Sequence, residues 1–239
     1  MKHFVVFVVL LAACTLAGRA QSSIRVGLQA GMVYSDADIS GRYWAFSTKF
    51  RHGFTVQALT EFPVYEFISV VVAPGYIQRG FVTEPFERRD EANRFLGNFE
   101  SEILLNDIEF PAYVLFRAMS EGFSPFLFIG KSFTIRASAR TTVRPVGPVE
   151  GGAWTTIPVS DDYQTFDEGF LGGLGFDIPL GKRAVMTVSG RYSRSFLNAN
   201  KHNGLSYYFY EFSMTGGLKF NISSDSRSPK RTPAGDNPD

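Results

Sequence analysis

Hydrophobic and polar residues alternate along most of this chain, and the alternation is clearest in residues 207–222. One face of that stretch carries Tyr208, Tyr210, Phe212, Met214, Gly216, Leu218, Phe220 and Ile222, and the other carries Phe209, Glu211, Ser213, Thr215, Gly217, Lys219 and Asn221. A period of two predicts an extended strand, because successive side chains of a strand point to opposite faces. The apolar face approaches the roughly 9–11 residues that a tilted strand needs to cross hydrocarbon, and its aromatic residues gather near the two ends. We therefore predict a membrane-crossing strand here.

The same alternation predicts seven earlier strands, joined by connections of alternating length. The strands are expected at residues 23–34, 52–62, 67–81, 104–118, 126–136, 168–180 and 184–196. Long connections follow the first, third, fifth and seventh strands, at residues 36–50, 83–102, 137–166 and 197–206, and short turns follow the others. The connection at residues 83–102 is dense in charge, so we expect a solvated loop that is helical or disordered.

Short turns at one end and long loops at the other are typical of outer-membrane barrels. We therefore predict an all-β fold: a single closed, antiparallel, up-and-down transmembrane β-barrel of about eight strands. Its location would be the cell outer membrane, with short periplasmic turns and long extracellular loops. An even strand count would place both chain termini in the periplasm.

Polar residues on the opposite faces of these strands are expected to point into the barrel. They are Arg25, Gln29, Gln57, Glu61, Glu109, Arg117, Lys131, Arg191, Glu211 and Lys219. Their mixture of charges is compatible with an ion pathway or with a plug of mutual salt bridges. An eight-stranded interior is just wide enough for side chains to fill, which favours the plug and predicts no open pore. Glycines in the sixth strand indicate bends or bulges, or else close backbone approach to a ligand.

Composition and the chain ends add further constraints. The net charge of +1 over 239 residues gives no reason to expect nucleic acid as a partner. The N-terminus has the basic start, apolar core and small-residue region of an export signal, with cleavage expected after Ala20. A competing interpretation makes Cys14 the lipidated residue of a lipoprotein signal. The expected organisation is a signal peptide at residues 1–20, the barrel at 21–222 and a disordered periplasmic tail at 223–239.

The residue pattern predicts no catalytic, cofactor-binding or metal site. His3, His52 and His202 lack metal-ligand spacing, and no Ser/His/Asp grouping is visible. Trp44 and Trp154 lie in long connections, where we expect them to anchor the chain at the membrane surface. Binding of a partner or a surface glycan is the alternative for these two rings.

The local patterns, in this order, resemble the PorT-like outer-membrane β-barrel family that is common in Bacteroidota. The resemblance spans residues 24–222 and rests on Gly27-Leu28-Gln29-Ala30-Gly31 with Ser35, Gly75-Tyr76-Ile77-Gln78-Arg79-Gly80, Ile108-Glu109-Phe110-Pro111, Pro125-Phe126-Leu127-Phe128-Ile129-Gly130, Gly172, Gly173, Gly175, and Arg191-Tyr192-Ser193. The family usually has a Glu where this chain has Pro74-Gly75. The chain's last strand, with Thr215, Gly217, Phe220 and Ile222, also resembles the signal read by the outer-membrane assembly machinery. The family resemblance implies the fold and the membrane, and little about activity.

Three functions remain open from the sequence. The first is a small non-enzymatic outer-membrane barrel that acts as a membrane anchor or through its loops. Its partners would be outer-membrane lipid, the barrel assembly machinery, and surface or secretion-machine proteins. The second is an outer-membrane enzyme acting on lipid, with His52 or His202 in catalysis. The third is a secreted lipocalin-like barrel whose apolar residues face inward around a ligand. The loop asymmetry and the terminal aromatic strand favour the first.

Overall fold

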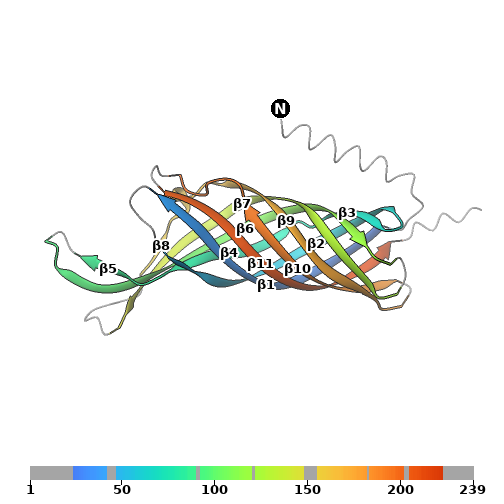
Figure 1. The fold of residues 1–239 in the computed structure, drawn as a ribbon, viewed down its shortest axis with the longest axis horizontal. Coiled ribbons are helices and arrows are strands. Elements are labelled where there is room, and N and C mark those ends of the chain that lie inside the picture. Colours follow the sequence, from blue (N-terminus) through green and yellow to red (C-terminus); the bar gives the residue numbers. More distant parts are fainter. Residues whose placement is uncertain are drawn as a thin grey trace, which may run out of the picture.

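A closed ring of antiparallel strands forms the body of the molecule (Figure 1). The computed structural model describes residues 24–41, 47–89, 92–119, 122–147, 155–181, 183–201 and 205–222. The ring contains β1 (Ile24–Gly41), β2 (Thr48–Tyr65), β3 (Ile68–Val72) with β4 (Gly75–Thr83), β6 (Phe95–Arg117), β7 (Ser124–Val146), β9 (Phe166–Pro179), β10 (Ala184–Ser195) and β11 (Leu205–Ile222). β3 and β4 share one position between β2 and β6, so the ring has eight positions. The predicted fold class is confirmed.

The register of the ladders gives the tilt of the strands. Cα partners lead from Arg25 on β1 across β2, β3, β6, β7, β9, β10 and β11, and back to Ser35 on β1. One circuit therefore advances ten residues along β1. A barrel of this strand number and stagger requires strands tilted by roughly 40° and leaves an interior that side chains fill.

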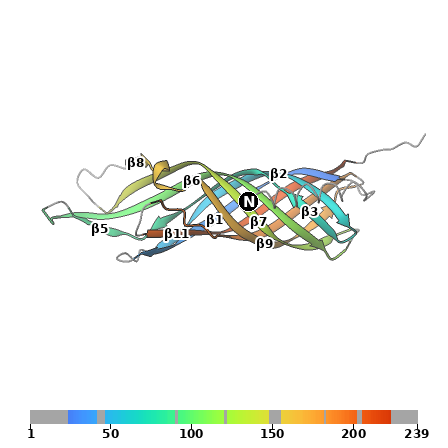
Figure 2. The ribbon, with the colours of Figure 1, turned by 90° about the horizontal axis from the view of Figure 1, so that it is seen from above.

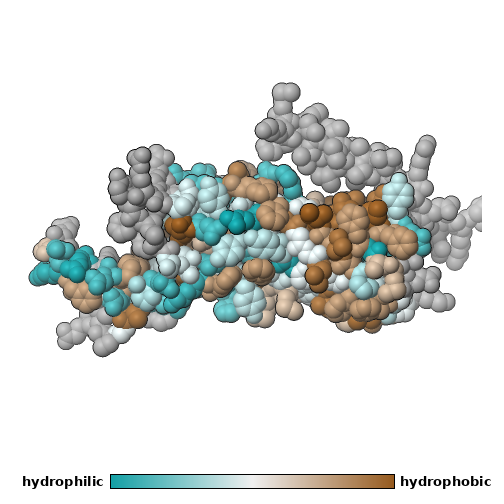
Figure 3. All heavy atoms as spheres, viewed as in Figure 1, coloured by the Kyte–Doolittle hydropathy of each residue, from teal (hydrophilic) through white to brown (hydrophobic). Residues whose placement is uncertain are grey.

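The apolar side chains of the ring point outward and the charged ones inward. Phe212, Leu218 and Phe220 are 49%, 43% and 50% exposed, whereas Glu61 and Glu211 are buried inside. Hydrophobic residues gather over the half of the molecule that carries the short turns (Figure 3). This arrangement is the reverse of a lipocalin-like barrel, so that alternative is wrong.

Two groups of aromatic rings mark the borders of the apolar surface. Nearer the long loops, ring contacts link Tyr34 with His52, Phe54 with Tyr76, Phe50 with Tyr210, Tyr192 with Phe212, and Phe170 with Phe196; we call these residues the upper girdle. At the turn end, exposed rings include Tyr65, Phe67, Phe123 and Phe220. Ten residues separate Tyr210 from Phe220, which at about 3.3 Å per residue and a tilt of about 40° spans about 25 Å, the height of a membrane-facing band.

The long connections contain more strand than the sequence predicts. The charged stretch at residues 83–102 is neither a helix nor an unstructured loop, because β5 (Phe86–Arg89) pairs there with the first residues of β6. Residues 137–166 continue β7 to Val146 and then hold β8 (Thr155–Pro158) and the 3-10 turn η1 (Ser160–Asp162). β5, β6, β7 and β8 together form a four-stranded sheet that projects beyond the ring (Figures 1 and 2). Local alternation missed this sheet because both of its faces mix apolar and charged residues.

Proline explains the break in the third predicted strand. A single strand over residues 67–81 is wrong, since β3 ends at Val72 and β4 begins at Gly75. Pro74 lies in the gap and has no N–H to donate to a ladder. Its carbonyl instead accepts a hydrogen bond from the N–H of Ala58 at 2.9 Å, so the segment between β3 and β4 remains hydrogen-bonded to β2.

Glycines on the inner face of β9 make room for two phenylalanine rings. A Cβ added to Gly173 would lie 2.5 Å from Cζ of Phe128, and one added to Gly175 would lie 2.6 Å from Cζ of Phe126. The ladders of β9 with β7 and β10 run without a register shift, so these glycines do not mark a bulge. The groups that closely approach the backbone at these glycines are two rings of the same chain. With Leu59, Leu115 and Leu171 they form an apolar layer inside the turn-end half of the barrel.

Several predictions concern residues outside the described ranges. They are the signal peptide at residues 1–20, Cys14, the tail at 223–239, Trp44, Trp154 and His202. Ile24 and Ile222 pair at the turn end, so the two ends of the described chain meet at the same end of the barrel. Among the described residues, no helix has the length and apolar character to cross a membrane.

Candidate functional site

Ion pairs fill the barrel interior at the turn end. Glu61 of β2 and Asp177 of β9 are each bound by both Arg117 of β6 and Lys219 of β11. The four N–O distances are 2.7 and 3.1 Å for Arg117, and 3.2 and 2.6 Å for Lys219. Arg25 adds a third cation to Glu61 at 3.2 Å. We call Glu61, Arg117, Asp177 and Lys219 the ionic quartet; because it joins four strands, it crosses the lumen and ties opposite walls together.

A second group of ion pairs occupies the middle of the barrel. Arg191 donates from Nη1 to Glu109 at 3.0 Å and from Nη2 to Glu211 at 2.8 Å. Gln57 donates to Glu109 at 3.1 Å, and the Ser193 hydroxyl donates to Glu211 at 2.8 Å. One arginine thus joins β6, β10 and β11 across the interior.

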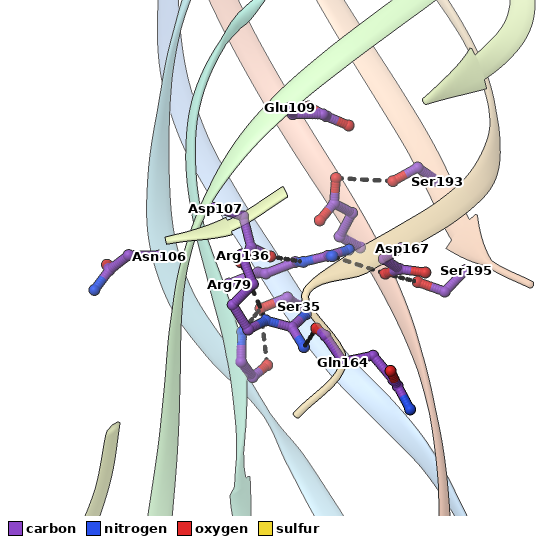
Figure 4. Close-up of polar contacts among 12 residues, drawn as sticks. Ser35, Arg79, Asn106, Asp107, Glu109, Arg136, Gln164, Asp167, Ser193 and Ser195 are labelled. Carbon is purple, nitrogen blue, oxygen red and sulfur yellow. Dashed lines mark hydrogen bonds and ion pairs between the residues drawn. The ribbon is translucent and has the colours of Figure 1, made fainter. Parts of the chain in front are cut away.

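A third group lies directly beneath the loop end (Figure 4). Arg79 of β4 binds Asp107 at 2.7 Å and Asp167 at 2.8 Å. Arg136 of β7 donates to the same Asp107 at 3.2 Å and to the backbone carbonyl of Gln164 at 3.0 Å. The Ser195 hydroxyl donates to Asp167 at 2.6 Å. These side chains come from five different strands, β4, β6, β7, β9 and β10, and meet in the lumen.

Above the third group, an apolar cap covers the mouth of the barrel. Phe81, Phe209 and Tyr163 are buried there, and Tyr207 packs against them. The segment after η1 is held across the mouth because Gln164 N–H donates to the Ala199 carbonyl at 2.7 Å. The Arg136 guanidinium lies 5.4 Å from the ring centre of Tyr163. Burial raises the pKa of the Tyr163 phenol above its ordinary value.

The interior charges balance. Among the described residues, the lumenal ion pairs join six cations to six carboxylates: Arg25, Arg79, Arg117, Arg136, Arg191 and Lys219 with Glu61, Asp107, Glu109, Asp167, Asp177 and Glu211. An ion entering this space would have to displace an existing partner, because each charged group already contacts one of opposite sign. The arrangement therefore suits a plug better than a conduit.

Nine of the ten residues predicted to face inward do so. Lys131 is the exception: its side chain is largely exposed on the outer surface and pairs with Glu168 at 2.7 Å. The prediction failed because β7 is apolar on both faces, with Phe126 and Phe128 inside and Leu127 and Ile129 outside. Alternation alone could not tell which face of this strand is lumenal.

The sequence prediction also missed five interior charges: Arg79, Asp107, Arg136, Asp167 and Asp177. Asp107 has the same parity as Glu109 along β6, so the alternation contained a signal for it. Arg136 follows the buried Ser132 and Thr134 at spacings of two, which is again the inward face. Asp167 and Asp177 were hidden because glycines separate them on the inner face of β9.

The histidine hypotheses find no support in the described part of the chain. His52 lies in the upper girdle, with its ring centre 4.9 Å from that of Tyr34 and the planes at 72°. Among the described residues, neither a serine nor a carboxylate is hydrogen-bonded to its ring. No group of three or more His, Cys, Asp or Glu side chains in the described ranges could hold a metal ion.

The projecting sheet is the second candidate site. Its two middle strands, β6 and β7, stay paired as far as Asn98 and Val146. Phe95, Leu96 and Ile157 are exposed large hydrophobic residues on this sheet. Glu87 and Arg89, which pair at 3.1 Å, are also exposed. The sheet therefore combines apolar and charged contacts in the part of the molecule that extends furthest from the barrel (Figure 1).

Comparison with known proteins gives one family match and several structural likenesses. A family model described as outer membrane protein beta-barrel domain matches residues 19–201. No curated protein sequence matches the chain. Similar solved structures include Neisserial surface protein A (13% identity, TM-score 0.44, covering 82% of this chain and 97% of that one) and OprG from Pseudomonas aeruginosa (11%, 0.45, 84% and 98%). The outer membrane protease OmpT from Escherichia coli is also similar (12%, 0.44, 84% and 97%). At these values, no activity is carried over to this chain.

Proposed function

Because this chain belongs to the outer membrane protein beta-barrel domain family, we propose that it is a closed, non-enzymatic barrel that presents its projecting sheet to a partner outside the cell. The outer membrane holds the ring, and the sheet formed by β5, β6, β7 and β8 extends past the upper girdle. The observation that carries the proposal is the ion-paired lumen beneath an apolar cap. A barrel filled in this way acts as an anchor, and its surface beyond the membrane carries the function.

Three features support this anchor role over solute transport. The ionic quartet and the Arg191 pairs cross the lumen at two levels. The rings of Phe126 and Phe128 fill the part of the lumen that lies against Gly173 and Gly175 of β9. The interior charge sums to zero, which leaves no excess charge to attract one kind of ion.

The asymmetry of the connections supports the orientation. Turns after β2, β6 and β9 are short, and the longer connections all lie at the other end, as in outer-membrane barrels with periplasmic turns. Both chain termini would then be periplasmic. Membership of the narrower PorT-like group, with surface or secretion-machine proteins as partners, is part of this proposal, and so is insertion by the barrel assembly machinery.

Conductance and surface labelling test the proposal. The full-length protein in a planar bilayer should give no steps of porin size, with a porin as the positive control. Phe95→Cys on the projecting sheet should react with a membrane-impermeant maleimide in intact cells. Phe123→Cys, exposed at the turn end, should react only after the outer membrane is permeabilised. Porin-like steps would refute the sealed barrel, and the opposite labelling pattern would refute the orientation.

A further inference from the structure

A basic patch lies on the outer surface at the loop end, just beyond the upper girdle. Lys49, Val82, Glu102 and Thr142 are opposite one another across β2, β4, β6 and β7, so they share the outer face. Arg140 and Arg144 lie two residues to either side of Thr142 on β7. The β2–β4 ladder shifts register between Phe50 and Thr55, and the Arg51 side chain in this stretch reaches Glu102 on the same face. We call Lys49, Arg51, Arg140 and Arg144 the basic patch.

The patch has more positive than negative charge. Arg51 Nε lies 2.9 Å from Glu102, and Arg144 pairs with the same carboxylate. Glu100, opposite Arg144 in the ladder, is a second carboxylate on this face, and the exposed Glu84, two residues beyond Val82, is a third. In the described part of the chain, Lys49 and Arg140 are exposed and have no ion pair or side-chain hydrogen bond. Among the described residues, four cations therefore face three carboxylates.

The outer surface outside the patch, from Lys131 on β7 through β9 and β10 to β1, differs. Lys131 pairs with Glu168 at 2.7 Å, and Arg194 pairs with Asp38 at 2.6 Å, so each cation there has its own carboxylate. Asp36, which accepts from the Tyr210 hydroxyl at 3.0 Å, adds a further negative group. The excess of positive charge is thus confined to the loop-end parts of β2 and β7 that carry the basic patch.

The surface below the patch is apolar. Ile108 and Ile135 are cross-strand partners on β6 and β7, and both are exposed toward the membrane. Phe110 continues this surface toward the turn end. A lipid alongside β6 and β7 would lay its acyl chains on these residues and bring its headgroup to the level of Arg140.

We propose that the basic patch binds the phosphate of a membrane lipid headgroup in the leaflet at the loop end. Arginine suits this ligand because its planar guanidinium donates two parallel hydrogen bonds to phosphate oxygens. Basic residues at a membrane border bind anionic headgroups, and pairing with them neutralises the excess charge of the patch. The inference depends on the membrane placement of the ring and holds for either orientation of the barrel.

Two lipids with identical chains test this inference. The full-length protein in a neutral detergent is titrated with dioleoyl phosphatidic acid or with dioleoylglycerol, and retained lipid is measured by native mass spectrometry. We expect retention of the phosphatidic acid alone. The double variant Lys49→Gln/Arg140→Gln should weaken its binding by roughly 30-fold, a factor of about five for each basic side chain. Neither residue has a side-chain partner in the described ranges, so folding should be preserved.

The matched control removes two cations that lie outside the basic patch. Lys131→Gln/Arg194→Gln carries the same change in net charge and should alter binding less than about twofold. Equal losses in the two double variants would overturn the site, since they would reflect net charge alone. Equal retention of dioleoylglycerol would overturn the role of phosphate. Displacement of the lipid by excess inorganic phosphate would show that the patch binds free phosphate rather than a lipid headgroup, and would overturn the proposal.

Discussion

Ion pairs inside the turn end and ion pairs on the outer surface use the same residue types in different surroundings. The Glu61 side chain is 1% exposed and contacts three cations, whereas the Glu168 side chain is 28% exposed and contacts Lys131 alone. Removing charges from water costs several kcal/mol per ion, so a buried group needs several partners to offset that cost. An exposed pair stays solvated and contributes little to stability. Burial, more than the number of charges, decides how much each ion pair contributes to stability.

The same need for several partners explains why the interior ion pairs join strands on opposite sides of the ring. A carboxylate shared by two cations from different strands is satisfied only when all three strands stand in the correct register. The ionic quartet joins β2, β6, β9 and β11 in this way. We infer that it helps to specify ring closure, whereas a pair between neighbouring strands, such as Lys131 with Glu168, reports only local pairing.

The largest expected effect comes from breaking the ionic quartet. Glu61→Gln should lower the free energy of unfolding by about 3–5 kcal/mol, because it leaves Arg117 and Lys219 buried with only Asp177 between them. Urea unfolding of the barrel in lipid vesicles, followed by circular dichroism, measures this change. Glu168→Gln on the outer surface is the matched control. A loss below about 1 kcal/mol for Glu61→Gln would contradict the distinction drawn between the two regions.

An intermediate effect is expected where the lumen is packed by rings. Gly173→Ala should destabilise the barrel by about 1–3 kcal/mol, because the new Cβ would collide with the Gly190 carbonyl oxygen and with the Phe128 ring. Adding Phe128→Leu should recover part of the loss, which a double-mutant cycle measures as a coupling energy. Gly172→Ala is the control, since a Cβ there meets only a carbonyl oxygen at 3.6 Å. Strictly additive effects would show that the ring is not what excludes a side chain.

The smallest effect is expected on the outer surface. Lys131→Gln should change the free energy of unfolding by less than about 1 kcal/mol, because the ammonium is exposed and contacts one carboxylate. The same urea transition measures it, at low and high salt. A loss as large as that of Glu61→Gln would mean that this pair is as desolvated as the quartet.

Alternation was a reliable guide where one face of a strand is apolar and the other polar. It correctly placed Glu61, Glu211 and Lys219 inside and Phe212 and Leu218 outside. It failed on β7, where both faces are apolar, and on β9, where glycines interrupt the inner face. It also missed the projecting sheet, because strands beyond the membrane need no apolar face toward lipid.

The sequence by itself determined the barrel, the inward and outward faces of most strands, and which end carries the short turns, because these follow from a period of two and from the placement of turn residues. Only the tertiary structure decided which charges meet. Arg117 and Asp177 are 60 residues apart in the chain, and Lys219 and Glu61 are 158 apart. Their contacts depend on the ten-residue stagger of the closed ring, which is a property of all eight positions together. No local sequence pattern specifies this ten-residue stagger. The ionic quartet, the cap and the basic patch therefore form only when the ring is closed.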